Sequence, residues 1–174
     1  MTVAISHDSE TPAHGQQVIT ACAFIHDDFD GVRKVFLPRR ADTKKFLPGV
    51  YELPGGHVDF GEDLVEDLKR EIFEEFGTRI NVGDPFAAFT YLNNIKGSHS
   101  VEVVYFARFA DDITNIKLSP EDHSDYGWFS EDELDRVITP NKSESDPEMR
   151  AIRKGFALLG GVGLEMADGI SDNL

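Results

Sequence analysis

Hydrophobic residues along the chain fall into short runs rich in β-branched and aromatic side chains, separated by turn-forming residues. Such runs favour β-strands, because these side chains fit a pleated, half-buried surface. Residues 93–98 have the asparagines and glycine of a hairpin turn between the two last long runs. The predicted strands are residues 18–25, 32–39, 51–53, 85–95 and 100–109, with a short strand around Trp128 and Phe129.

An amphipathic helix is predicted for residues 64–76. A rotation of about 100° per residue gathers its apolar and acidic side chains on neighbouring arcs. Asp63 is placed to cap its start, and Gly77 stands where helices end in a left-handed residue. The apolar arc contains Leu64, Val65, Leu68, Ile72 and Phe76. The acidic arc contains Asp67, Glu71, Glu74 and Glu75.

The remaining elements define one domain. A last helix starts with Asp146 as its N-cap and a proline at the first helical position, and a shorter helix is expected near residues 131–137. Residues 1–16 are polar without periodicity and are expected to form a flexible arm, and residues 162–174 a flexible tail. Mixed strands and helices over residues 17–161 therefore indicate a single α/β domain.

The acidic arc calls for a counter-charge. Like charges one helical turn apart destabilise an isolated helix by a few tenths of a kcal/mol per pair. A hard cation such as Mg²⁺ fits, because it takes carboxylate oxygens, waters and substrate phosphates. A solvated face is the commoner explanation for glutamates. The glycines Gly55 and Gly56 favour the ion site, because they let the backbone approach a ligand and direct carbonyls at a cation, and Gly61 allows another tight turn.

Residues 56–78, GHVDFGEDLVEDLKREIFEEFGT, resemble the signature box of the Nudix hydrolases, G-x5-E-x7-R-E-U-x-E-E-x-G-U, where U is aliphatic. Only the last position departs, with Thr78 in place of an aliphatic residue, which leaves the acidic residues intact. Residues 50–55 are similar to the usual lead-in of the family. The matching residues are Gly56, Glu62, Arg70, Glu71, Ile72, Glu74, Glu75 and Gly77.

The resemblance implies a fold, a reaction and a cofactor. The fold is the Nudix α/β/α sandwich around a mixed β-sheet. The reaction is hydrolysis of a diphosphate linkage in a nucleoside diphosphate derivative, with Mg²⁺, or Mn²⁺ in its place. Glu71, Glu74 and Glu75 take the positions of metal ligands, joined by the carbonyl of Gly55 or Gly56. One of these glutamates, or one outside the box, would orient or deprotonate the attacking water.

Other residues receive roles by position. Arg70 is expected to hold a box glutamate in place, with Glu62 as its structural partner, whereas Asp67 is expected to be solvated. Glu121 is the candidate for an additional catalytic acid, although a polar run here is also typical of a surface loop. His123 is interpreted, in order of preference, as a solvated side chain, a substrate contact or a proton carrier.

Substrate contacts are sought outside the box. Arg39 and Arg40 end a predicted strand, from which a guanidinium can bind a phosphate or stack on a base, although a surface pair is commoner. Tyr51 and Phe24 could pack against a base, although aromatic residues on strands more often lie in the core. Cys22, the single cysteine, is expected to be a buried, inert thiol in a reducing compartment.

Composition limits the partners. A length of 174 residues suits one domain. The net charge of −15 argues against binding polymeric DNA or RNA, which relies on Lys/Arg clusters, whereas small nucleotides remain compatible when metal ions mask the repulsion. No run reaches the roughly 18 apolar residues of a membrane span, and the start lacks the order of a signal peptide. We expect a cytoplasmic protein without membrane contact. Relatives are often dimers, so a homodimer is also expected.

The substrate is the least determined feature. No pattern after Gly77 matches those of ADP-ribose, NADH or diadenosine polyphosphate hydrolases, which favours a nucleoside triphosphate pyrophosphohydrolase. ADP-ribose or a nucleotide sugar is the alternative. A non-catalytic nucleotide-sensing Nudix domain is less suitable, because such domains commonly lose box acids. An allylic diphosphate isomerase is remote, because it uses a characteristic cysteine and glutamate, and Cys22 lies far upstream.

Overall fold

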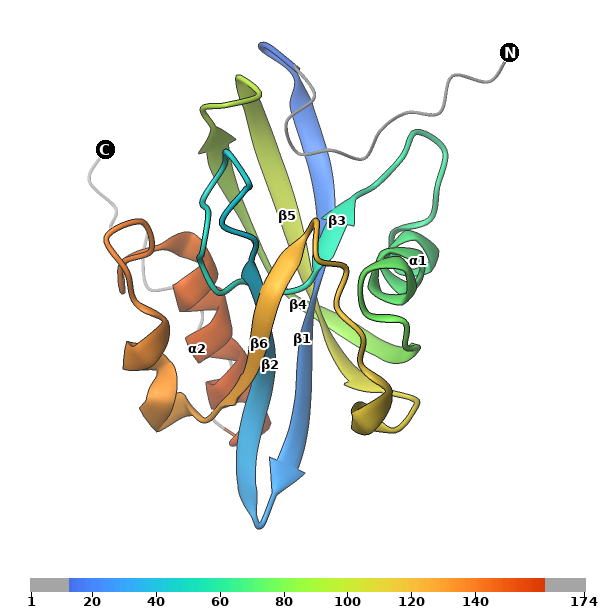
Figure 1. The fold of residues 1–174 in the computed structure, drawn as a ribbon, viewed down its shortest axis with the longest axis vertical. Helices are drawn as coiled ribbons and strands as arrows, with labels where there is room; N and C mark the ends of the chain where they lie inside the picture. Colours follow the sequence, from blue (N-terminus) through green and yellow to red (C-terminus); the bar gives the residue numbers. More distant parts are fainter. Residues whose placement is uncertain (1–12, 162–174) are drawn as a thin grey trace, which may run out of the picture.

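A computed structural model describes residues 13–161 of the chain (Figure 1). Its centre is a six-stranded mixed sheet with the strand order β4-β5-β1-β2-β6, and β3 pairs with β1. The elements are β1 (Gln17–Phe29), β2 (Val32–Arg40), β3 (Gly55–His57), α1 (Leu64–Phe76), β4 (Ile80–Asn93), β5 (Ser98–Phe109), the 3₁₀-helix η1 (Ile113–Asn115), β6 (His123–Phe129), the 3₁₀-helix η2 (Glu131–Val137) and α2 (Pro147–Leu159).

Strand β1 organises the sheet. One of its edges pairs in parallel with β5 over residues 17–25. Its other edge is divided, because residues 20–22 pair with β3 and residues 26–29 pair with β2. Strands β3 and β2 therefore diverge along one edge of β1.

Helices cover both faces of the sheet, with α1 on one side and η2 and α2 on the other (Figure 1). Alternation along β1 and β2 divides their apolar side chains between these two layers. The predicted α/β/α sandwich is confirmed. On the α1 side, Ala21, Ala23, Ile25 and Phe36 pack with Leu68, Ile72 and Phe76. On the α2 side, Cys22, Phe24, Val35 and Leu37 pack with Met149, Ile152 and Phe156.

The helix boundaries follow the predicted caps. Asp63 accepts hydrogen bonds from the backbone of Val65 and Glu66 at the start of α1, and Gly77 ends the helix with a φ of 65°. Asp146 caps α2. These boundaries were predictable because capping depends on residues within one turn.

Strand boundaries differ more from the predictions. The predicted strand at residues 51–53 is wrong: Tyr51 makes one isolated bridge with Arg39, and the strand of this region is β3, at residues 55–57. The backbone N–H of Leu53 instead bonds to the Glu148 side chain, 2.6 Å away, which takes it out of any ladder. Strand β4 begins at residue 80 rather than 85, and β1 continues to residue 29.

The described chain starts inside the predicted arm. Ala13 is buried, and its N–H donates to the Lys96 carbonyl at 3.0 Å. The Gly15 N–H donates to the Gly97 carbonyl at 2.9 Å, so residues 13–16 are bound to the β4–β5 hairpin. The rest of the predicted arm and the predicted tail lie outside the described residues. Between residues 13 and 161, the helices are too short or too polar to cross a bilayer.

Candidate active site

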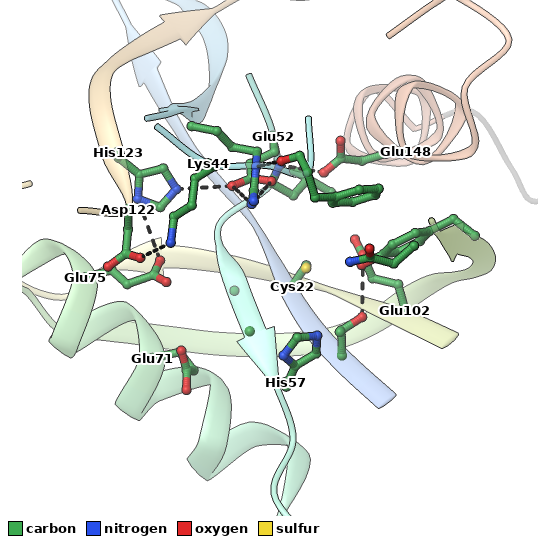
Figure 2. Close-up of a pocket in the computed structure, with 18 residues that line it drawn as sticks. Cys22, Lys44, Glu52, His57, Glu71, Glu75, Glu102, Asp122, His123 and Glu148 are labelled. Carbon is green, nitrogen blue, oxygen red and sulfur yellow. Dashed lines mark hydrogen bonds and ion pairs between the residues drawn. The ribbon is translucent and has the colours of Figure 1, made fainter. Parts of the chain in front are cut away.

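A polar cavity of about 120 Å³ lies between the N-terminal half of β1, β3, α1 and the start of β6 (Figure 2). It occupies the region where β3 and β2 diverge. Its lining is rich in ionisable side chains from elements far apart in the sequence. The acidic ones are Glu52, Glu71, Glu75, Glu102, Asp122 and Glu148, and the basic ones are Arg40, Lys44, His57 and His123.

Helix α1 contributes two carboxylates to this cavity, one turn apart. Glu71 is 5% exposed, and its carboxylate lies against Gly56, where a Cβ would stand 2.5 Å from Glu71 Oε2. A Cβ on Gly55 would stand 2.1 Å from the Ala21 carbonyl oxygen. Both glycines are therefore required by close approach, one to a site carboxylate and one to the backbone of β1.

Arg70 binds four acidic side chains on α1 or just before it. Its Nη1 donates to Glu71 Oε1 at 2.8 Å and to Glu74 Oε2 at 3.2 Å, and its Nη2 donates to Glu62 Oε2 at 3.1 Å and to Asp67. Partial burial opposes its charge, but Glu62 and the other carboxylates outweigh this and raise the pKa of Arg70. The guanidinium thus fixes Glu71 and Glu62 relative to each other, a geometry that suits the predicted brace.

Asp67 and Glu74 depart from the expectations for the acidic arc. Asp67 is 1% exposed and bound by Arg70, so its expected solvation is wrong. Burial, together with a hydrogen bond to Glu62, raises the pKa of Asp67 to about 7. The Glu74 side chain is 55% exposed, bonded to Arg70 and not part of the cavity lining. Of the predicted metal ligands, the structure brings Glu71 and Glu75 into the cavity, but not Glu74.

Glu75, the second cavity carboxylate on α1, is 17% exposed and lies near His123 of β6. Its Oε2 has no hydrogen-bond partner among the described residues, and His123 Nδ1 is 3.9 Å away. Burial raises the pKa of Glu75 well above its usual range, and the nearby Asp122, Glu52 and Glu71 add to the shift. The position strongly favours a neutralising partner, which can be a proton or a cation.

The opposite wall is a chain of paired charges. Lys44 Nζ donates to Asp122 Oδ1 at 2.8 Å, His123 Nε2 lies 3.2 Å from Glu52 Oε1, and Arg40 Nη1 lies 3.2 Å from both Glu52 oxygens. Burial alone would raise the pKa of Glu52, but Arg40 and His123 lower it to about 2. His123 is 4% exposed, so it is not a solvated side chain. Arg40 Nη2 is buried with no hydrogen-bond partner in the described part of the chain.

In two places the structure separates a predicted site residue from its neighbour in the sequence. Glu121 is exposed and lies outside the cavity lining, whereas its neighbour Asp122 is part of it. Arg40 lines the cavity, whereas Arg39 points elsewhere and binds Asp42 at 2.9 Å. Glu121 and Asp122 lie in the turn before β6, and the register between β2 and β6 shifts between Arg39 and Arg40, so that one residue of each pair reaches the site.

The aromatic candidates belong to the core. Tyr51 packs edge-to-face on Phe129, with ring centroids 5.1 Å apart, and Phe24 is fully buried. Neither lines the polar cavity. Cys22 is buried as predicted, and burial, with Glu102 beside it, raises the pKa of its thiol well above the usual range. A thiol in that state is a poor nucleophile.

A second cavity, of about 400 Å³, adjoins the first and has a more apolar lining. Phe46 and Tyr91 stand at the boundary, with rings inclined by 13° and centroids 6.0 Å apart. Nearly parallel aromatic rings beside a charged cavity suit a flat ring joined to a phosphorylated group.

Comparison with known proteins identifies the family. The family model described as NUDIX domain matches residues 16–152, most of the chain. The chain is a Nudix hydrolase. It is 30% identical over 141 residues, 72% of this chain and 83% of the relative, to the RNA pyrophosphohydrolase of Erythrobacter litoralis. It is 29% identical over 105 residues, 56% of this chain and 74% of the relative, to the nucleoside triphosphatase NudI of Salmonella paratyphi B.

A solved structure gives the same result for the fold. The MutT NUDIX hydrolase of Burkholderia pseudomallei superposes with a TM-score of 0.62 at 26% identity, covering 80% of this chain and 98% of that one. The Nudix box therefore coincides with β3, α1 and the loop between them, the elements that form one wall of the cavity.

The site of this Nudix hydrolase suits a hard divalent cation. Its acidic lining supplies carboxylate oxygens, and the buried Glu75 Oε2 lacks a hydrogen-bond partner among residues 13–161. Over the same residues, no group of three or more His, Cys, Asp or Glu side chains is arranged to hold an ion. Waters and substrate phosphates would have to complete the shell, as is usual for Mg²⁺.

Several residues of the Nudix hydrolase site were not predicted. Lys44 lies in a polar loop, and Glu148 begins the last helix, and neither has a local signal for a functional site. Glu102 had a local signal, because a lone carboxylate among the valines of a predicted strand is either exposed or buried for a functional reason. Glu52 had another, its position just before the glycines of the box.

Proposed function

We propose that this Nudix hydrolase cleaves a diphosphate linkage in a small nucleotide in the presence of Mg²⁺, with nucleoside triphosphates as its preferred substrates. One observation carries the proposal. The cavity contains both a buried guanidinium nitrogen, Arg40 Nη2, and a buried carboxylate oxygen, Glu75 Oε2, without hydrogen-bond partners among the described residues. A magnesium diphosphate satisfies both, because its oxygens accept from Arg40 and its cation binds Glu75.

The residues divide between holding the cation and holding the phosphates. Glu71, Glu75 and the Gly55 carbonyl are the proposed ligands, and Glu74 is a weaker candidate because it is exposed and lies outside the cavity lining. The bound cation would neutralise charge that develops on the phosphoryl oxygens. Arg70 positions Glu71 through their 2.8 Å hydrogen bond.

The basic residues hold the phosphates from the other wall. Arg40 is fixed by Glu52, with one guanidinium nitrogen left for a ligand oxygen. Lys44 is fixed by Asp122 at 2.8 Å. Burial would raise the pKa of Asp122, but Lys44 lowers it, so Asp122 stays ionised and can accept a hydrogen bond from an attacking water.

The preference for nucleoside triphosphates has two supports. The aromatic boundary formed by Phe46 and Tyr91 provides a place for the base next to the phosphates. Two similar proteins are named a nucleoside triphosphatase and an RNA pyrophosphohydrolase. With a net charge of −15, this chain lacks the broad basic surface that a long RNA needs, so a nucleotide is favoured over a polymer.

A substrate screen tests the proposal. Purified protein is incubated with nucleoside triphosphates, ADP-ribose, nucleotide sugars, diadenosine polyphosphates and a 5′-triphosphorylated RNA, with Mg²⁺, with Mn²⁺, or with EDTA. Products are separated by ion-exchange chromatography. We expect metal-dependent release of pyrophosphate and a nucleoside monophosphate, lost in EDTA. Preference for ADP-ribose or nucleotide sugars would move the protein to the alternative class. If no compound is hydrolysed, the proposed hydrolysis is wrong and a non-catalytic nucleotide-sensing domain is the better description.

A further inference from the structure

We propose that Glu102 recognises the amino group of a nucleobase and thereby sets base preference. This inference rests on the proposed function, because it assumes that the phosphates occupy the cavity lined by Glu71 and Glu75. Figure 2 shows Glu102 and Glu148 on the opposite side of the cavity from these two α1 carboxylates, with Cys22 between them.

Five residues line both cavities, and three of them are carboxylates: Phe46, Tyr91, Glu52, Glu102 and Glu148. A ligand that spans the two cavities has to pass these side chains. The aromatic pair offers faces to a flat ring, and a carboxylate offers a polar contact to the edge of that ring. Only a carboxylate with an oxygen that is not already hydrogen-bonded within the protein can make this contact.

Two of the three carboxylates are committed within the protein. Glu52 binds Arg40 through both oxygens and also contacts His123. Glu148 accepts from the Leu53 N–H at 2.6 Å through Oε1 and from Lys142 through Oε2. Neither has an oxygen left without a partner.

Glu102 differs. It is 6% exposed, and its Oε1 has no hydrogen-bond partner in the described residues, apart from a weak interaction of the carboxyl with the Cys22 thiol. Its Oε2 lies 3.5 Å from Thr20 Oγ1, which also donates to the Val101 carbonyl at 3.3 Å. A buried oxygen without a strong partner costs free energy that a ligand donor can recover.

The Thr20 hydroxyl determines what kind of ligand atom fits. When Glu102 is ionised, both of its oxygens accept hydrogen bonds. When it is protonated, Oε2 can donate to the Thr20 oxygen, while the hydroxyl proton goes to Val101. In both of these arrangements Oε1 is an acceptor, and the ligand atom that satisfies it is a donor.

The donor that fits is an amino group on a flat ring. Glu102 shares both cavities with the carboxylates Glu52 and Glu148, so a carbonyl edge of a base turned toward these three side chains would meet mainly acceptors. An exocyclic amino group, as in adenine, cytosine or guanine, supplies N–H donors at the rim of a ring that can lie against Phe46 and Tyr91. A site built to hydrogen-bond such a group discriminates against the analogue that lacks it.

Equilibrium binding of matched nucleotide pairs tests this inference without turnover. The probes are methylene-bridged, non-hydrolysable triphosphates of adenosine and purine riboside, of cytidine and pyrimidin-2-one riboside, and of guanosine and inosine. The members of each pair differ in one amino group. Dissociation constants are measured by titration calorimetry with Mg²⁺ for wild type, E102L, E102Q and E131Q.

We expect wild type to bind the amino-bearing member of at least one pair about tenfold more tightly, a factor typical of one hydrogen bond to a charged or buried group. E102L should abolish the difference while keeping the affinity for the other member. E102Q should keep it, because its amide oxygen can still accept. E131Q, at an exposed site on η2, should behave like wild type.

Two results overturn the inference: less than twofold discrimination in all three pairs by wild type, or unchanged discrimination in a folded E102L. The wild-type measurement needs no variant, so the inference can be refuted even if E102L does not fold. Turnover in the substrate screen without amino discrimination refutes only the role of Glu102. Amino discrimination without turnover refutes only the proposed hydrolysis.

Discussion

At the scale of single residues, buried polar atoms without partners mark the site. Most buried polar groups in folded proteins are hydrogen-bonded, so exceptions call for an explanation. Several of the exceptions among the described residues share one cavity, although they come from β2, α1, β5 and β6. Their clustering indicates a ligand that carries both donors and acceptors. These cavity-lining exceptions are Arg40, Glu75, Glu102 and His123.

Glu75→Gln should reduce kcat on the order of a hundredfold, the size of loss seen when a group that stabilises developing charge is removed. Its free energy of unfolding at pH 7 should not fall, because the ionised carboxylate is buried without a partner and its pKa is raised. Steady-state kinetics with Mg²⁺ and urea unfolding measure the two quantities.

Glu74→Gln is the matched comparison, on the same helix and with the same loss of charge. Its side chain is 55% exposed and bound to Arg70, so we expect a smaller loss of kcat than for Glu75→Gln. Equal activity of Glu75→Gln and wild type, or a larger loss in Glu74→Gln, would show that the proposed ligand set is wrong.

At the scale of elements, the short strand β3 and helix α1 form one unit. β3 pairs with residues 20–22 of β1 and brings Gly56 against Glu71 on α1. A larger residue at Gly55 would meet the β1 backbone, and one at Gly56 would meet the Glu71 carboxylate. The strand therefore sets the position of α1 relative to the sheet.

The two glycines should respond differently to alanine. At Gly55 the added Cβ meets the Ala21 carbonyl oxygen, part of the β1 backbone, so Gly55→Ala should lower the free energy of unfolding by roughly 2 kcal/mol or more. At Gly56 it meets the flexible Glu71 side chain, so Gly56→Ala should lower kcat with a smaller loss of stability.

Urea unfolding and kinetics on both variants measure these effects. A Gly56→Ala variant with wild-type activity would show that Glu71 need not lie where the structure places it. Gly31→Ala offers a comparison outside the site, because a Cβ there has no neighbour within 4 Å, although its φ of +81° carries a strain of its own.

Features that depend on nearby residues could be predicted from the sequence, whereas features that depend on strand pairing or tertiary packing could not. The helix α1, its caps at Asp63 and Gly77, and the contacts of Arg70 depend on residues within a few turns, so their spacing was informative. The limits of β3 depend on pairing with β1, and the places of Lys44 and Glu102 depend on tertiary packing. Glu121 was predicted but its neighbour Asp122 lines the cavity, because the turn before β6 decides which of the two residues faces the site.

At the scale of the whole molecule, the sheet is covered by two apolar layers, but its acidic interior makes stability depend on pH. Burial, followed by the charge of Glu148, raises the pKa of Glu102 from 4.5 to about 8. The folded state then binds a proton that the unfolded chain releases. The free energy of unfolding should therefore fall as the pH rises from about 4.5 to about 8.

Glu102→Gln should remove the part of this dependence that Glu102 contributes. Relative to wild type, the variant should gain stability as the pH rises, by about 4 kcal/mol at pH 8.5 compared with pH 4.5, since each pKa unit corresponds to about 1.4 kcal/mol. Urea unfolding at intervals between these pH values measures the difference. The free energy of unfolding of the control variant Glu131→Gln should change with pH as that of wild type does. Parallel curves for Glu102→Gln as well would show that Glu102 titrates normally in the folded protein.

The parallel pairing of β1 with β5 also limits when the protein can complete its fold during synthesis. Ile19 pairs with Val101 and Ala21 with Val103, so the first strand made by the ribosome waits for residues about eighty positions later before its parallel edge is filled. Helix α2, which supplies Glu148, emerges later still. The Nudix box is synthesised in the middle of this interval. Its carboxylates therefore leave the ribosome well before the surface that confines them, and the enzyme becomes competent only when nearly the whole domain has emerged.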